Sequence, residues 1–122
     1  MKINYESEKP IFMQLAEEIE NAVISGAFPE GEQIPSITEL SATLKINPAT
    51  ANKGVNMLVD AGIVYKKRGL GMFVQEGAVK MLTEKKKNEF IEEHITALVD
   101  EAKKLGLTKA DVLSIIEKQF DK

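Results

Sequence analysis

The chain has 122 residues, 43% of them hydrophobic and 29% charged, which is enough for one compact domain or two very small ones and excludes a large multidomain enzyme. Its formal charge is −3, so an argument for a nucleic-acid partner has to rest on where the charges lie. The chain has no cysteine, which excludes disulfides, thiolate zinc sites and cysteine nucleophiles.

Catalysis and metal binding lack the residue patterns that they need. Carboxylates are plentiful, but they stand at helical surface spacing, without a nucleophile–base pair or a phosphate-cradling glycine loop. The single histidine, His94, is flanked by Glu92 and Glu93, and no further metal ligands are evident. The amino terminus is polar, and no run approaches the roughly eighteen apolar residues of a membrane helix. We therefore expect a soluble, cytoplasmic protein that is not an enzyme and needs no cofactor, metal or membrane.

The first predicted element is an amphipathic helix over residues 10–25. Its apolar residues recur every four positions, and they are Ile11, Leu15, Ile19 and Val23. Glycine and proline then interrupt the pattern until Ser36 and Glu39, which have the spacing of a capping box. This pair predicts a short second helix with Ile37, Leu40 and Leu44 on its buried side.

A third helix and a β-hairpin follow. Asn47 and Pro48 predict a helix start, and the helix is expected to run to about Ala61 with Ala51, Val55 and Leu58 facing inward. Beyond Gly62, residues 63–65 and 72–74 are rich in β-forming residues and flank the turn sequence RGLG at 68–71. Three helices followed by a hairpin is the order of a winged helix-turn-helix.

The remainder of the chain is expected to be helical. Gly77 is the predicted domain boundary, which gives domains of residues 1–77 and 78–122. A long helix is predicted from about Val79 to Leu105, and a capping-box pair, Thr108 and Asp111, starts a final helix. A two-helix hairpin of this size is too small to bury its apolar faces alone, so packing against a second copy is favoured over a monomer core. The residues expected at this dimer interface are Ile91, Ile95, Leu98, Ala102, Leu105, Val112, Ile116 and Phe120.

Charge is segregated along the sequence. Residues 40–75 contain five basic residues and one acidic residue, a local charge of +4, whereas residues 1–39 contain two lysines and eight carboxylates, a local charge of −6. The basic part coincides with the third helix and the hairpin. Helix starts at Ser36 and Asn47 add free amides that can bind phosphate. This placement favours DNA as the partner in spite of the negative total.

Four separated blocks resemble the amino-terminal signature of GntR-family transcription regulators. They are IPSITELS at 34–41, NPAT at 47–50, LVDAG at 58–62 and RGLGMFV at 68–74, and the resemblance spans residues 10–75. The short tail resembles the YtrA-like subfamily, whose members lack a large ligand-binding domain and dimerise through two carboxy-terminal helices. The resemblance implies an α+β fold, a winged helix-turn-helix DNA-binding domain followed by a two-helix dimerisation tail.

The resemblance also implies which residues contact DNA. In this fold the third helix enters the major groove, where Asn52 and Asn56 are the best candidates for reading adenine, and Ala49 or Thr50 could touch a thymine methyl. Ser36 and Thr38 are expected at backbone phosphate, and the hairpin at phosphate or in the minor groove. The full set is Ser36, Thr38, Pro48, Ala49, Thr50, Asn52, Lys53, Asn56, Lys66, Lys67, Arg68 and Gly69.

This chain departs from its relatives at three of these positions. Many relatives have arginine where it has Thr38, Pro48 and Asn52. Losing these cations implies weaker phosphate attraction per monomer and more reliance on the hairpin and on dimerisation. The operator sequence is consequently not predictable.

Two functional hypotheses follow. The first is a homodimeric, sequence-specific regulator, a repressor of an ABC-type transporter operon, that binds a pseudo-palindromic operator in double-stranded DNA. The alternative is a winged-helix protein-interaction module without specific DNA binding, in which the hairpin contacts a partner protein. No residues indicate a small-molecule effector, which stays unknown.

Overall fold

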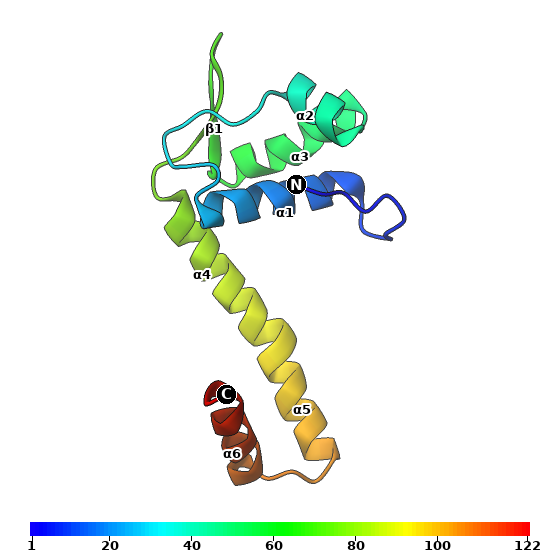
Figure 1. Cartoon of the computed structure of the whole chain (residues 1–122), viewed down its shortest axis with the longest axis vertical. Helices are drawn as coiled ribbons and strands as arrows, with labels where there is room; N and C mark the ends of the chain where they lie inside the picture. The colour runs from blue at the N-terminus through cyan, green and yellow to red at the C-terminus, as the bar shows by residue number, and fades with distance from the viewer. The chain divides into compact units, whose positions relative to one another are not determined.

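The first helix of the computed structural model, which describes residues 1–122, is α1 (Ile11–Ser25) (Figure 1). Its four-residue apolar repeat becomes the buried side of the helix, and Leu15, Ile19 and Val23 are completely buried. Gly26 ends the helix in the left-handed conformation, with φ +86°. The prediction of this amphipathic helix is confirmed.

Two capped helices form the helix-turn-helix. The hydroxyl of Ser36 accepts a hydrogen bond from the Glu39 amide, and the Glu39 carboxylate accepts one from the Ser36 amide, each at 3.1 Å, which starts α2 (Ile37–Leu44). The Asn47 side chain accepts from the Ala49 amide at 2.8 Å and starts α3 (Pro48–Asp60). Both predicted starts are confirmed.

A hairpin of β1 (Val64–Lys67) and β2 (Gly71–Val74) follows α3. The strands are antiparallel, with Val64 opposite Val74 and Tyr65 opposite Phe73. The linker between α1 and α2 also pairs with β2, through Gly31 N to Val74 O at 2.8 Å and Ile34 N to Met72 O at 2.9 Å. The sequence did not predict this additional backbone pairing, which connects the hairpin to the segment just before the helix-turn-helix.

The core of this part of the chain joins all its elements. Side chains of α1, α2, α3 and both strands form one apolar cluster together with the first turns of α4 (Ala78–Phe90). The buried members are Leu15, Ala16, Ile19, Val23, Ile34, Leu40, Leu44, Ile46, Ala51, Val55, Leu58, Ile63, Val64, Val74, Ala78 and Leu82. The α+β winged helix-turn-helix predicted for this region is confirmed.

The start of α4 is held by a carboxylate from the linker. The two oxygens of Glu30 accept hydrogen bonds from the amides of Gly77 and Val79, at 2.9 and 3.0 Å. These backbone hydrogen bonds, Gly77 first, lower the pKa of the Glu30 carboxyl below its ordinary value. A carboxylate at a helix amino terminus also interacts favourably with the helix dipole.

The chain beyond Glu84 forms a second unit, Lys85–Lys122, and the first unit is Met1–Glu84. The predicted domain division after Gly77 stays a prediction. The second unit contains the rest of α4, a π-helical segment η1 (Ile91–Ile95), α5 (Thr96–Lys104) and α6 (Lys109–Phe120). None of the chain's helices has the length and apolar character that crossing a membrane requires.

The π-helical segment corrects the prediction of a regular helix from Val79 to Leu105. The Thr96 amide bonds to the Ile91 carbonyl, five residues back, so this turn is wider than an α-helical turn. In a regular helix, residues seven positions apart, such as Ile91 and Leu98, lie on the same face. The wider turn between them removes this alignment. The ring of His94 lies beside that of Phe90, with centroids 5.5 Å apart.

The start of α6 is as predicted. Thr108 and Asp111 form a capping box, with the Thr108 amide donating to the Asp111 carboxylate at 2.9 Å. This backbone bond and the one with the Thr108 side chain lower the pKa of Asp111. Gly106, in the left-handed region at φ +75°, follows the end of α5.

Gly54 brings α1 and α3 into close contact. It lies in the middle of α3, where glycine normally disfavours a helix. A Cβ atom there would lie 2.7 Å from the Phe12 carbonyl oxygen and 3.2 Å from Cδ2 of Leu15, both in α1. The missing side chain is therefore what allows the two helices to approach this closely.

Gly54→Ala is expected to destabilise the domain although alanine favours helix by about 1 kcal/mol over glycine. The added methyl group overpacks the contact with the rigid backbone of α1, at a cost of roughly 1–3 kcal/mol. Chemical denaturation measures the change, with Asn56→Ala, on the exposed face of α3, as the control that should change little. A raised denaturation midpoint for Gly54→Ala would contradict this account of the contact.

Candidate nucleic-acid interface

One face of α3 is free of the core. Ala51, Gly54, Val55 and Leu58 are buried against α1 and α2. The opposite face is exposed and presents Pro48, Ala49, Asn52, Lys53 and Asn56, with Thr50 half-buried beside them. Asn52 and Asn56 are one helical turn apart, so the two amides lie on the same side of the helix.

Lys53 is positioned by an aromatic ring of α1. Its ammonium lies 4.0 Å from the ring centroid of Phe12, a distance at which the cation is attracted to the ring face. The lysine remains exposed in this position. Its charge is therefore fixed at the α1 side of α3 without an acidic partner that would neutralise it.

The start of α2 presents fewer free amides than its sequence suggested. The Glu39 carboxylate already accepts from the Ser36 amide, and the Ser36 hydroxyl accepts from the Glu39 amide. A bound phosphate would compete with this carboxylate. Thr38 is exposed in the same turn, while Ser36 is half-buried.

The hairpin carries cations on both faces. Because side chains alternate along a strand, Lys66 and Lys67 point to opposite sides, and they stand opposite Met72 and Gly71. The Lys67 ammonium lies 4.6 Å from the Phe73 ring centroid, and Phe73 stacks on Tyr65 at 5.8 Å. Arg68 and Gly69 are exposed in the turn. The hairpin is therefore basic on each side and at its end.

Gln33 connects the linker to the hairpin turn. Its side-chain Nε2 donates to the Leu70 carbonyl at 2.7 Å. Gly71, with φ +121°, leaves the room for this amide, since a Cβ there would lie 2.5 Å from Nε2. Sequence reasoning missed Gln33, because nothing local to residue 33 indicates a partner 37 positions away.

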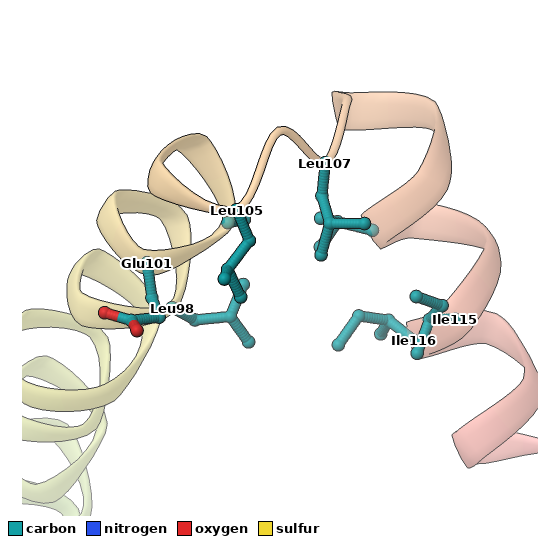
Figure 2. A pocket seen from close by; sticks show the side chains of 8 residues that line it. Leu98, Glu101, Leu105, Leu107, Ile115 and Ile116 are labelled. Carbon is teal, nitrogen blue, oxygen red and sulfur yellow. The ribbon is translucent and has the colours of Figure 1, made fainter.

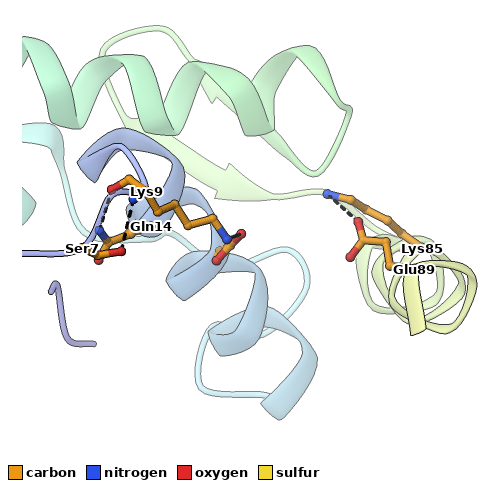
Figure 3. A network of polar contacts seen from close by, with 6 residues as sticks. Ser7, Lys9, Gln14, Lys85 and Glu89 are labelled. Atoms are coloured by element: carbon orange, nitrogen blue, oxygen red, sulfur yellow. Dashed lines mark hydrogen bonds and ion pairs between the residues drawn. The ribbon is translucent and has the colours of Figure 1, made fainter. Parts of the chain in front are cut away.

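The amino-terminal segment is folded onto the helix-turn-helix. The Tyr5 hydroxyl donates to the Leu44 carbonyl at the end of α2. Gln14 Nε2 donates to the Lys9 carbonyl at 2.8 Å, and the Lys9 amide donates to the Ser7 hydroxyl at 3.1 Å (Figure 3). Sequence reasoning assigned no role to this segment, and Tyr5 is the residue in it that reaches the turn between the two helices.

The structure places the predicted DNA-contacting residues on the first unit's surface. Ten of the twelve are exposed, and Ser36 and Thr50 are half-buried. Figure 1 shows the hairpin rising beyond α3 on the side away from α1.

Lys85, in the separate lysine run of α4, pairs instead with Glu89 of the same helix at 3.9 Å (Figure 3). The second unit contains no buried residue except Ala102.

Comparison with known proteins identifies this arrangement. Residues 13–74, which include most of α1, the helix-turn-helix and the hairpin, match the profile of bacterial regulatory proteins of the gntR family. The chain belongs to the GntR family. It is therefore a DNA-binding transcriptional regulator and not an enzyme, and the resemblance seen in the four sequence blocks is confirmed.

The chain is similar to GntR regulators of about its own length. It is 31% identical to an uncharacterized HTH-type transcriptional regulator of Bacillus subtilis, YhcF, over 96% of this chain and 95% of that protein. It is 29% identical to the HTH-type transcriptional repressor YtrA of the same organism, over 88% of this chain and 82% of that protein. These are short relatives of the GntR family, as the tail suggested.

The solved structures similar to this chain include complexes with operator DNA. The crystal structure of the AraR DNA-binding domain in complex with operator ORX1 is 25% identical to this chain and superimposes with a TM-score of 0.56. The match covers 61% of this chain and 95% of that one. The matched part of this chain thus corresponds to nearly the whole of a DNA-binding domain that was crystallised with its operator.

Proposed function

We propose that this GntR regulator is a homodimeric repressor that binds a pseudo-palindromic operator and controls a transporter operon of the ABC type. The proposal rests on one observation: α3 has an exposed polar face, and the hairpin beside it is basic on both sides. The similarity to YtrA, named a repressor, supports the repressor role. The resemblance to the YtrA-like subfamily is the basis for proposing a transporter operon.

The proposed division of labour follows from the chemistry of each side chain. Asn52 and Asn56 offer amides that can bond bidentately to adenine in the major groove, and Ala49 or Thr50 offers a methyl group for thymine. Lys53 and the hairpin cations neutralise phosphates and add affinity on any sequence. Ser36, the N-cap of α2, and Thr38 in its first turn contact backbone phosphate.

The proposed dimer uses the apolar side of the second unit. Leu98 of α5 and Leu105, which follows α5, point toward α6, and Ile116 points back across a cavity of about 260 Å³ (Figure 2). Leu105 is 69% exposed and Phe120 is 85% exposed, so one copy of the hairpin leaves much apolar surface in water. Burying a leucine or phenylalanine side chain stabilises a protein by about 1.5–3 kcal/mol. Contact with a second copy of the chain would bury these side chains.

The residues proposed at this interface are apolar side chains of the second unit. They are Ile91, Ile95, Leu98, Ala102, Leu105, Val112, Ile116 and Phe120, and all but Ala102, Val112 and Ile116 are exposed in the single chain. An isologous dimer would relate two copies of the first unit by a twofold axis, which matches an operator with two inverted half-sites.

Binding to the DNA upstream of its own gene, measured by fluorescence anisotropy at several salt concentrations, tests the proposal. If Lys53, Lys66, Lys67 and Arg68 each neutralise one phosphate in both protomers, the log–log slope should be about −7, from roughly −0.9 per phosphate. A scrambled duplex of the same length and composition is the control. Equal affinity for both duplexes, or a flat salt response, would refute operator recognition.

Asn52→Ala and Arg68→Ala should separate base reading from phosphate binding. Arg68→Ala should weaken binding to operator and scrambled DNA alike, because a phosphate contact carries no sequence information. Asn52→Ala should lower affinity for the operator by roughly 1–3 kcal/mol and leave the scrambled duplex nearly unchanged. Equal losses on both duplexes from Asn52→Ala would remove its proposed role in base reading.

Leu98→Asp should convert the dimer to monomers, because it places a carboxylate in the proposed apolar interface. Sedimentation velocity measures the change, and operator affinity should fall with it. Ser114→Asp, which adds the same charge on the exposed side of α6, is the control that should remain dimeric. A dimer that survives Leu98→Asp would show that the interface lies elsewhere.

A further inference from the structure

The hairpin ends in an exposed leucine. Leu70 is 64% exposed and lies between Gly69, with φ +79°, and Gly71, with φ +121°. Neither neighbour has a side chain that could cover it. A single exposed leucine is ordinary on protein surfaces, so the exposure alone implies nothing. What distinguishes Leu70 is the way in which its backbone is held.

Both backbone polar groups of Leu70 are hydrogen-bonded within the domain. Its amide donates to the Lys67 carbonyl at 2.9 Å, and its carbonyl accepts from Gln33 Nε2 at 2.7 Å. Gln33 belongs to the linker that also pairs with β2 through Phe73. These contacts with the rest of the domain hold the hairpin tip in one orientation. Binding therefore costs little further conformational entropy.

The charges around Leu70 favour a polyanion as the surface that covers it. Lys66 and Lys67 lie on opposite faces of the hairpin, and Arg68 lies in the turn. An apolar protein interface would leave these cations desolvated without partners. The minor groove of B-DNA has a phosphate backbone along each side. A hairpin tip with a cation on each face matches this groove in charge.

We propose that Leu70 is an apolar wedge that the hairpin presses into the minor groove beside each half-site. The inference rests on the proposed operator binding and adds a specificity determinant to it. Apolar side chains at minor-groove base steps unstack and kink the duplex, and the cost is lowest at flexible steps such as TA and CA. Leu70 therefore selects deformable sequence at a position that α3 does not read, and Gln33 is its positioning residue.

The test uses one DNA probe and three substitutions at the same position. The probe is a duplex that the wild-type protein selects from a random 40-bp pool, labelled at its two ends so that energy transfer reports bending. Leu70→Ala should bind about tenfold more weakly, as expected for losing one buried leucine, and should bend the duplex less. Leu70→Met, which keeps an apolar side chain of similar size, should retain both properties.

Leu70→Lys distinguishes a wedge from a contact made by charge alone. Under the proposal it binds scrambled duplexes more tightly, because a lysine adds phosphate contact on any sequence, but it loses the bend and the preference for a flexible step. Gln33→Met, which removes the amide donor at similar size, should reduce bending as Leu70→Ala does while leaving the base preference of α3 unchanged. Thermal unfolding of all four variants should match the wild type, since the residues are exposed.

Three results would overturn the proposal. If Leu70→Ala binds and bends the selected duplex as the wild type does, the hairpin works by charge alone. If Leu70→Ala leaves DNA binding intact but alters self-association in sedimentation velocity, the tip contacts protein. If the wild type selects no sequence from the pool, the proposed operator binding itself fails and the wedge fails with it.

Discussion

The close contact between α1 and α3 at Gly54 determines which side of α3 faces solvent. The backbone of α1 lies against Gly54, and Ala51 and Val55 are buried on the same side of α3. The opposite side, with Asn52 and Asn56, is left exposed. The helix-turn-helix and the hairpin therefore pack around a helix whose orientation this contact helps to fix.

The linker between α1 and α2 gives the hairpin a comparable constraint. Its backbone pairs with β2, its Gln33 side chain holds the turn, and its Glu30 carboxylate holds the start of α4. One short segment therefore contacts the hairpin, which is proposed to touch DNA, and the helix that continues into the second unit. The cations of the hairpin are displayed on a supported edge and not on a free loop.

Charge placement reconciles a negatively charged protein with a DNA partner. The acidic residues of the first 39 positions and the cations of α3 and the hairpin belong to different segments, and the fold keeps the cations exposed. Attraction to phosphate depends on the local field, which is screened over about 8–10 Å at physiological salt. A total charge of −3 is thus compatible with a basic DNA-facing surface.

Features set by nearby residues could be predicted from the sequence. The capping pair Ser36 and Glu39 and the start at Asn47 and Pro48 are interactions over three residues or fewer, so their patterns are visible in the chain. The pairing of residues 31–34 with β2 was not, because it joins segments about 40 positions apart and the linker shows no strand alternation.

Local exceptions were also missed. Lys45 adopts the left-handed conformation, at φ +55°, where glycine is the usual residue, and tertiary packing around the turn overrides its preference. The π-helical segment η1 has no distinct sequence signature. For the candidate site, helical periodicity predicted which face of α3 is exposed, but the hydrogen bond from Gln33 that aims the hairpin depends on the folded structure.

α3 and the hairpin are proposed to bind one DNA duplex together. Titration of the isotopically labelled protein with operator duplex, followed by amide chemical shifts, can show whether they do. Signals of residues 48–56 and 66–70 should shift along a single saturation curve, while those of Glu17 and Glu18 in α1 stay unchanged. Shifts confined to the second unit, or different saturation curves for α3 and the hairpin, would show that the two elements do not bind the same duplex.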